Sequence, residues 1–271
     1  MRLVRILRYE LLKARGTVVW IVVLSASLSI FAYGIPILSE ISASSAVMRE
    51  VTVVSWMYVP TYIAGLGRAA APILGTVIGI SVALNEIRSG TAYSAAVVGH
   101  GWPRLALIKM LTSSLVAILS IGAMFTAAYL MCAIGSIVLP IDSGVTPASG
   151  ASFTRVFTAN LLVYTGFLLW AGIGWLVSAL TLSTIYSYIV AATWIFAEQF
   201  SYYPYLPGSI HAGVTEAWID YLPDGYTVLW PSVGIAALPI WVLICATILT
   251  YAVALSVWVY RHGRLTLGST S

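Results

Sequence analysis

The chain has 271 residues, of which 60% are hydrophobic and only 8% are charged. Because an ordinary soluble domain carries about 25% charged residues, this composition excludes a soluble globular protein and predicts a membrane protein. The net charge of +4 comes from basic residues that flank apolar runs, without the basic and aromatic surface of a nucleic-acid module. We therefore expect membrane lipid, and no nucleic acid, as a partner.

The N-terminal segment, MRLVRILRYELLKARG, has the pattern of an amphipathic helix. On a helical projection its apolar and basic residues separate, with Leu3, Val4, Leu7 and Leu11 on one face and Arg2, Arg5, Arg8 and Lys13 on the other. This pattern predicts a helix in the cytoplasmic interface, with its basic face toward anionic headgroups. Its recurring charges do not fit a cleavable signal peptide.

The first span is expected at about 17–38, and the second span is interrupted by Arg68 and by prolines. If the apolar runs on both sides of Arg68 crossed the membrane, the Arg- and Lys-rich segments at 1–16 and 86–109 would lie on opposite sides, which the positive-inside rule disfavours. We therefore expect one crossing at about 63–85, with Arg68 near the outer interface. Gly75 and Gly79 form a G-x-x-x-G in this span, which permits close packing within the chain or between two copies.

Charged residues gather between the second and third spans. Glu86 and Arg88 end the second span, Gly90 lets the backbone turn, and Thr91 can cap a new helix. Residues 92–98, which include Tyr93 and Ser94, are mostly small and compatible with a helix, and they predict a short helix along the cytoplasmic surface.

This short helix is expected to stop at GHGWP, residues 99–103, because glycine and proline break helices. Arg104 and Lys109 then begin the third span, at about 107–132. Such a helix between two charge clusters has the shape of a lever, and its small side chains would let another protein approach closely.

The uncharged run 156–197 must cross the membrane twice, because as a helix it would be about 63 Å long and the hydrocarbon core is about 30 Å thick. The turn is expected at SALTLSTIYS, residues 178–187, whose hydroxyls can satisfy backbone groups at helix ends. The chain is thus predicted to be a single all-α transmembrane domain, residues 1–271, with six spans at about 17–38, 63–85, 107–132, 156–178, 184–200 and 235–260.

The charges give this arrangement an orientation. Both termini are expected in the cytoplasm and the protein in the cell membrane, because positive charge collects on the cytoplasmic side. Ten of the 13 basic residues fall in the predicted cytoplasmic segments: Arg2, Arg5, Arg8, Lys13, Arg15, Arg88, Arg104, Lys109, Arg261 and Arg264.

The predicted spans lack the residues that catalysis would need. No histidine falls inside one, and the acids Glu40, Glu86 and Glu198 are expected at span ends. The chain also has no G-x-x-x-x-G-K-[ST] motif, so we expect no enzymatic activity, no metal and no cofactor bound by the chain itself. Apolar midplanes also disfavour a proton- or sodium-driven transporter and favour a translocator powered by a separate subunit.

In these features the chain resembles the permease subunits of type-2 ABC exporters. Those permeases have six spans with both ends inside, and a cytoplasmic E-x-R-x-G-T motif that precedes a short helix, an Arg and a later Lys. The matching residues here are Glu86, Arg88, Gly90, Thr91, Arg104 and Lys109, and the N-terminal E-x-x-K with a nearby Arg is matched by Glu10, Lys13 and Arg15.

The resemblance implies a coupling helix at 91–98 and an outer re-entrant hairpin between the fifth and sixth spans, at 202–231. It also implies two copies of a cytoplasmic P-loop ATPase, which would hold ATP and magnesium, and a second permease as a homodimer or related heterodimer. The cargo would be hydrophobic or amphipathic: a peptide, an antibiotic or a lipid-like compound. The alternative from another class is a non-transporting immunity or assembly factor in the membrane.

Overall fold

The computed structural model describes residues 8, 10–12, 15–42, 59–88, 101–138, 153–199, 206–219 and 239–268, and this part of the chain is helical without strands. The helices are α2 (Arg15–Ser42), α3 (Val59–Arg88), α5 (Gly101–Val138), α6 (Phe153–Thr181), α7 (Thr184–Gln199), α8 (Pro207–Ile219) and α9 (Ile240–Gly268). Five of them, α2, α3, α5, α6 and α9, are long and apolar enough to cross a membrane. The all-α prediction is therefore confirmed, and these five helices indicate a multi-pass membrane protein.

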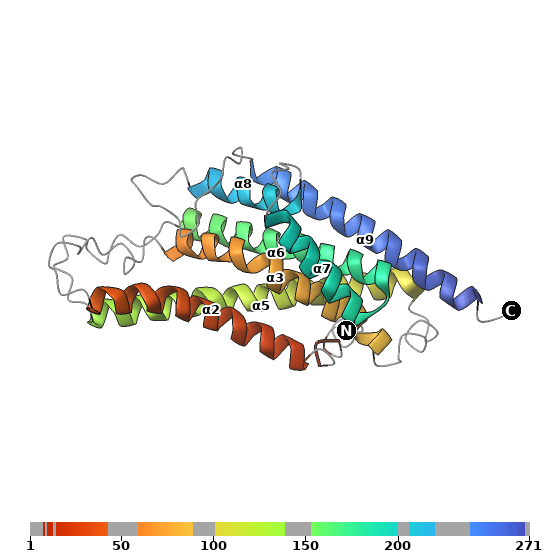
Figure 1. Cartoon of the computed structure of the whole chain (residues 1–271), viewed down its shortest axis with the longest axis horizontal. Coiled ribbons are helices and arrows are strands. Elements are labelled where there is room, and N and C mark those ends of the chain that lie inside the picture. The colour runs from red at the N-terminus through yellow and green to blue at the C-terminus, as the bar shows by residue number, and fades with distance from the viewer. Residues whose placement is uncertain are drawn as a thin grey trace.

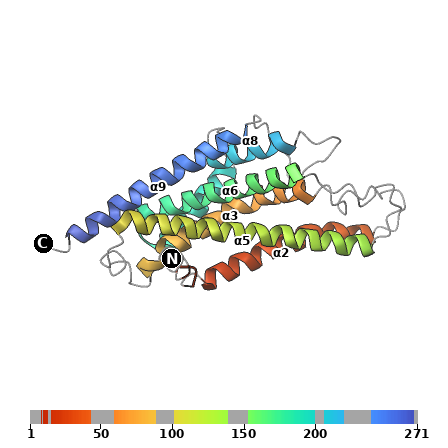
Figure 2. The ribbon, with the colours of Figure 1, turned by 180° about the vertical axis from the view of Figure 1, so that it is seen from behind.

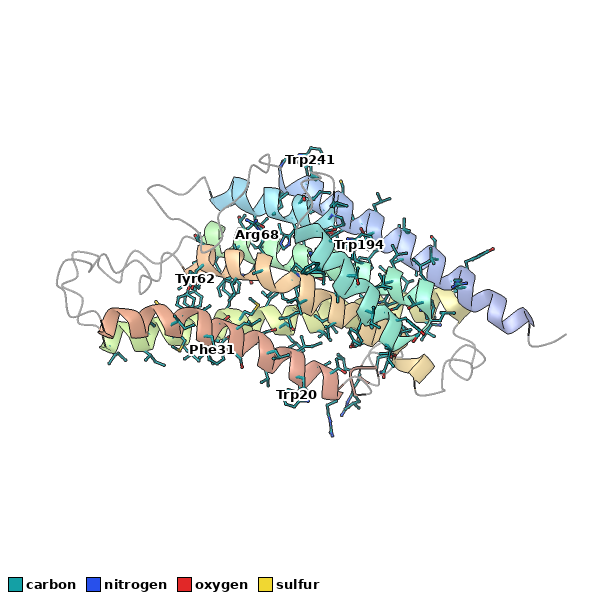
Figure 3. All side chains as sticks on the ribbon, in the orientation of Figure 1. Trp20, Phe31, Tyr62, Arg68, Trp194 and Trp241 are labelled. Atoms are coloured by element: carbon teal, nitrogen blue, oxygen red, sulfur yellow. The ribbon has the colours of Figure 1, made fainter. Side chains whose placement is uncertain are left out.

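Helices α3 and α6 form the centre of an elongated bundle (Figure 1). Their facing surfaces carry glycines and large buried side chains, among them Ile78, Phe167 and Trp170. Helix α2 packs chiefly on α5, and the two lie side by side in both views, whereas α9 lies along α6 (Figure 2). Many side chains of α2 and α9 face outward, as Trp20, Phe31 and Trp241 do in Figure 3. Outward apolar side chains are expected where lipid surrounds the protein.

Helix α3 is one continuous helix. This agrees with the single crossing that was predicted from the charged segments on both sides of it. Pro60 lies in its first turn, where a missing N–H costs nothing, and only Pro72 lies inside it. Arg68 is not at the end of this helix but well within it, and its side chain is half-buried.

The start of α5 differs from the prediction. The segment GHGWP was expected to end the preceding short helix, with Arg104 beginning the next helical segment, but α5 already begins at Gly101 and includes Trp102 and Pro103. A proline in the first turn of a helix removes only an N–H that has no helical partner, so Pro103 starts the helix rather than ending one.

The turn between α6 and α7 lies where the hydroxyl-rich segment predicted it, at Leu182 and Ser183. Leu182 has a φ of 53°, the left-handed conformation that commonly ends a helix, and its N–H donates to the carbonyl of Ser178 at 2.9 Å. The hydroxyls of Thr181 and Ser187 lie 2.7 Å apart, and Ser187 Oγ also donates to the carbonyl of Ser183. Side-chain hydroxyls thus satisfy the backbone of this turn, as expected.

The fifth predicted span, at 184–200, corresponds to α7, but α7 has only 16 residues. At 1.5 Å per residue it is about 24 Å long, shorter than a hydrocarbon core of about 30 Å. The segment predicted as an outer hairpin contains α8, whose residues 211–215 are buried and which packs against α3, α6, α7 and α9. The rest of that predicted hairpin lies outside the described residues.

Candidate functional site

The predicted coupling residues that lie on described helices, Glu86, Arg88, Arg104 and Lys109, are near the ends of α3 and α5 at one end of the bundle. The C-terminal ends of α3, α6 and α9 and the N-terminal ends of α5 and α7 lie there together (Figure 1). This is the alternation of segments that the predicted spans require. We call this the coupling end and the opposite end the far end.

Lys109 fastens two helices at the coupling end. Its side chain is fully buried, and its Nζ donates to the carbonyl of Val82 in α3 at 2.7 Å. Arg104, which precedes Lys109 on α5, is exposed. Lys109 was expected beside Arg104 at a charged surface, but the structure places it inside the bundle, as an internal tie between α5 and α3.

Arg261 makes a second tie at the coupling end. Its Nη2 donates to the carbonyl of Leu180 at 2.7 Å and its Nε to the carbonyl of Ala179 at 3.5 Å. These carbonyls belong to the last turn of α6, where backbone acceptors lack helical partners and the helix dipole is negative. A cation on α9 therefore caps α6 and holds the ends of the two helices together.

The other expected coupling residues lie at or beyond the described helix ends. Glu86 and Arg88 belong to the last turn of α3, but the described part of the structure does not include their side chains. The residues Gly90, Thr91, Tyr93 and Ser94 lie outside the described residues. Their roles stay predictions.

The N-terminal residues are described in part. Glu10 is buried and Leu11 packs against the core, whereas Arg8 and Arg15 are exposed. Lys13 lies outside the described residues. Leu11 therefore faces the bundle, and the burial of Glu10 shows that this residue too packs on protein.

Gly75 and Gly79 pack within the chain. A Cβ on Gly79 would lie 2.1 Å from the carbonyl oxygen of Ala171, and a Cβ on Gly75 would lie 2.7 Å from the carbonyl oxygen of Phe167. On α6, a Cβ on Gly174 would lie 2.5 Å from the carbonyl oxygen of Thr76. The G-x-x-x-G of α3 therefore forms a close seam with α6, which resolves the open choice in favour of packing inside one chain.

Glu198 lies in the last turn of α7, but its surroundings differ from those predicted. It was expected at the end of a span, but its carboxylate touches Gly208, which also lies beside Trp170. Trp170 in turn packs on Gly75. Since Trp170 and Gly75 are near the middle of α6 and α3, Glu198 lies near the middle of the bundle.

Two further ionisable residues, His211 and Arg68, lie about one helical turn from Glu198, toward the far end. His211 of α8 is fully buried and rests on Gly166 of α6, whose absent Cβ would lie 2.3 Å from His211 Nε2. Arg68 of α3 interacts electrostatically with this imidazole. Figure 3 shows Arg68 and Trp194 on the same side of the bundle, near α8.

These polar groups change one argument made from the sequence. Apolar midplanes were counted against a proton- or sodium-driven transporter, but Glu198, Arg68 and His211 place ionisable groups inside the bundle. Sequence pattern missed the positions of Glu198 and His211 because α7 and α8 are separate short helices, and a hydropathy run cannot show that two short helices meet inside a bundle. The useful signal was α7 itself, which is too short to cross alone and ends at an acid.

Comparisons with known proteins do not identify a relative. No protein-family model, no curated protein and no solved structure matches this chain. The interpretation of the site therefore depends on the residues and their contacts.

Proposed function

We propose that this chain is the transmembrane permease subunit of an ATP-driven ABC exporter and that it moves a hydrophobic or amphipathic cargo out of the cytoplasm or inner leaflet. The observation that best supports the proposal is the hydrogen bond from Lys109 to the carbonyl of Val82. It fastens the helices on both sides of residues 89–100. A push on that connection would therefore move α3 and α5 together.

The packing of the bundle carries such a movement further. The glycine seam joins α3 to α6 along their length, and Arg261 holds the end of α9 to the end of α6. Displacing the ends of α3 and α5 would thus tilt the bundle as a unit rather than bend a single helix. This is the response that a transporter powered from its cytoplasmic side needs.

In this proposal the energy comes from another subunit, and the given sequence contains no P-loop motif. The proposed complex contains two permeases and two copies of a P-loop ATPase, which bind ATP and magnesium. Residues 91–98 would touch the ATPase, with Glu86, Arg88 and Arg104 around them.

The experiment compares Glu86→Ala and Gly90→Val with the parent for co-purification of a P-loop ATPase and for cargo export, both normalised to membrane abundance. We expect both variants to reach the membrane in near-normal amounts but to lose ATPase binding or to hydrolyse ATP without export. Gly122→Ala is the matched control, because a Cβ there meets no atom within 4 Å. Variants that bind ATPase and export like the parent would refute the coupling role, and a parent that never binds an ATPase would favour an immunity or assembly factor.

A further inference from the structure

Glu198 lies at the junction of two helices, neither of which can cross a membrane alone. Helices α7 and α8 have 16 and 13 residues, or about 24 Å and 20 Å of helix. Glu198 is in the last turn of α7, and Gly208 is the second residue of α8. Discontinuous helices of this kind are typical of ligand sites inside membrane proteins, because the break exposes polar backbone groups.

The carboxylate of Glu198 is held by donors from both helices. Its Oε2 accepts a hydrogen bond from the N–H of Gly208 at 2.7 Å, and its Oε1 accepts one from the indole Nε1 of Trp194. A Cβ on Gly208 would lie 2.2 Å from Oε2, so a glycine is needed for this approach. The positive end of the α8 dipole adds to the stabilisation, and the position of the carboxylate is therefore well defined.

A second indole lies beside this carboxylate and has an unused donor. A Cβ on Gly208, which would lie 2.2 Å from Glu198 Oε2, would lie 3.4 Å from Cζ2 of Trp170. The indole ring and the carboxylate are therefore close neighbours. Trp170 is almost completely buried, and its Nε1, on the same edge of the ring, has no hydrogen-bond partner among the described residues. Because a buried unpaired donor is costly, its presence beside a carboxylate points to a ligand with an acceptor.

These groups define the chemistry of a ligand. A carboxylate can accept about four hydrogen bonds, and it binds a charged donor about twice as strongly as a neutral one. Indole rings also attract cations within about 6 Å of their centres. An ammonium group would fit Glu198, and a carbonyl oxygen one or two atoms away would accept from Trp170 Nε1.

The surroundings indicate how an amphipathic ligand would lie. The exposed apolar side chains of α7, among them Ile185, Ile189 and Phe196, lie on the face of the helix opposite Glu198 and so do not line its site. Toward the far end, Arg68 and His211 lie about one turn beyond the carboxylate. The positive charge of Arg68 would repel an ammonium group there, so the ammonium group belongs at Glu198.

We propose that Glu198, Trp170 and Trp194 form a binding site for the α-ammonium and adjacent carbonyl of an amphipathic α-amino amide, the group at a peptide N-terminus. This inference rests on the proposed function in one respect, because it names the class of cargo. Binding itself requires no ATPase.

The test uses the purified full chain in phosphatidylcholine nanodiscs, a lipid without a primary amine, with retention by empty nanodiscs subtracted. The probes are leucine dodecylamide, its neutral N-acetyl derivative, and dodecylamine, which lacks the carbonyl. We expect saturable binding of leucine dodecylamide, weaker binding of dodecylamine, and no specific binding of the acetylated probe. Equal binding of the acetylated and free amines would overturn the proposal.

Three variants separate charge from geometry. Glu198→Gln keeps an acceptor for the Gly208 N–H but removes the charge, and should weaken binding of leucine dodecylamide roughly tenfold or more. Gly208→Ala keeps the charge but displaces the carboxylate, and should also weaken it. Trp170→Phe removes the indole N–H together with part of the ring, so it should reduce the preference for leucine dodecylamide over dodecylamine, with the melting temperature reporting the cost of the lost volume.

The exposed Thr193 on α7 offers a matched control, Thr193→Val, which should bind like the parent. Melting temperatures of all variants report whether they fold, and the comparison of probes on the parent decides the matter even if a variant unfolds. Parental affinity in Glu198→Gln would leave the carboxylate as an ordinary structural tie. If leucine dodecylamide binds as expected but no ATPase co-purifies with the chain, only the exporter proposal is refuted and the binding site stands.

Discussion

Gly79 lies where the backbones of two helices touch, so it reports directly on the seam between α3 and α6. Because a Cβ at this position would lie 2.1 Å from the carbonyl oxygen of Ala171, Gly79→Ala should lower the free energy of unfolding by about 1–3 kcal/mol. Thermal or SDS-induced unfolding in detergent measures this change. Gly122→Ala, with open space around it, should instead raise stability by up to about 1 kcal/mol. Equal effects of the two changes would contradict the seam.

Lys109 is a buried cation with a defined acceptor, and its replacement tests the tie between α5 and α3. Lys109→Met keeps most of the side-chain volume but leaves the carbonyl of Val82 without this donor. We expect a loss of about 1–3 kcal/mol in unfolding free energy. Arg104→Met removes an exposed cation from the same helix and should change stability by about 0.5 kcal/mol or less. If the two variants unfold alike, Lys109 is not a structural tie.

At the residue scale, the sequence located charges better than it located their surroundings. Lys109 and Glu198 were both recognised as charges next to apolar runs. Whether such a residue faces a surface or a helix interior depends on which helix packs opposite it, and periodicity contains no such information. Gly75 and Gly79 were recognised as a packing motif, but the residues that they contact on α6, Phe167 and Ala171, follow much later in the chain and were not predictable.

Leu182 offers a test at the scale of one element, the turn that ends α6. A φ of 53° is costly for leucine and free for glycine, by about 1 kcal/mol. Leu182→Gly should therefore raise the melting temperature, because the gain from relieved backbone strain exceeds the loss of a half-buried side chain. Replacing a residue of ordinary φ by glycine usually lowers stability instead. Ser183→Gly, its neighbour in the same turn, is the control and should lower stability. Thermal unfolding of the two variants gives the comparison, and a lower melting temperature for Leu182→Gly would argue against the left-handed turn.

Most helices were predictable because long apolar runs leave few alternatives in a membrane protein. The turn at 182–183 was predictable because the segment around it is rich in hydroxyl side chains. The continuity of α3 across Arg68 was predictable because the basic segments on both sides of the first two spans were expected on the same side of the membrane. The start of α5 was wrong because a Pro near Gly was taken as a stop, although the first turn of a helix tolerates both. Helix α8 was missed as a helix because aromatic residues and prolines surround it in the sequence.

At the scale of the whole molecule, the order of helix ends predicts on which side each connection lies. In a background without Cys132 and Cys245, Ser94→Cys should react with a membrane-impermeant thiol reagent only after cells are opened. Ser143→Cys, in the connection at the far end, should react in intact cells. Labelling of both from outside would contradict the alternation of the helices.

The uneven burial of the bundle has a mechanical consequence. In the most apolar window of α2 and of α9 only 22% of residues are buried, against 78% for α6. When the protein is pulled out of the membrane by its C-terminus, α9 should therefore separate from the bundle first and at low force. The force should peak when α6 is drawn from the seam with α3, since the interlocked glycine backbones must separate together. Single-molecule extraction traces would then show the highest force at the seam between α3 and α6. The order of the force barriers would depend on how closely the backbones approach rather than on the hydrophobicity of each helix.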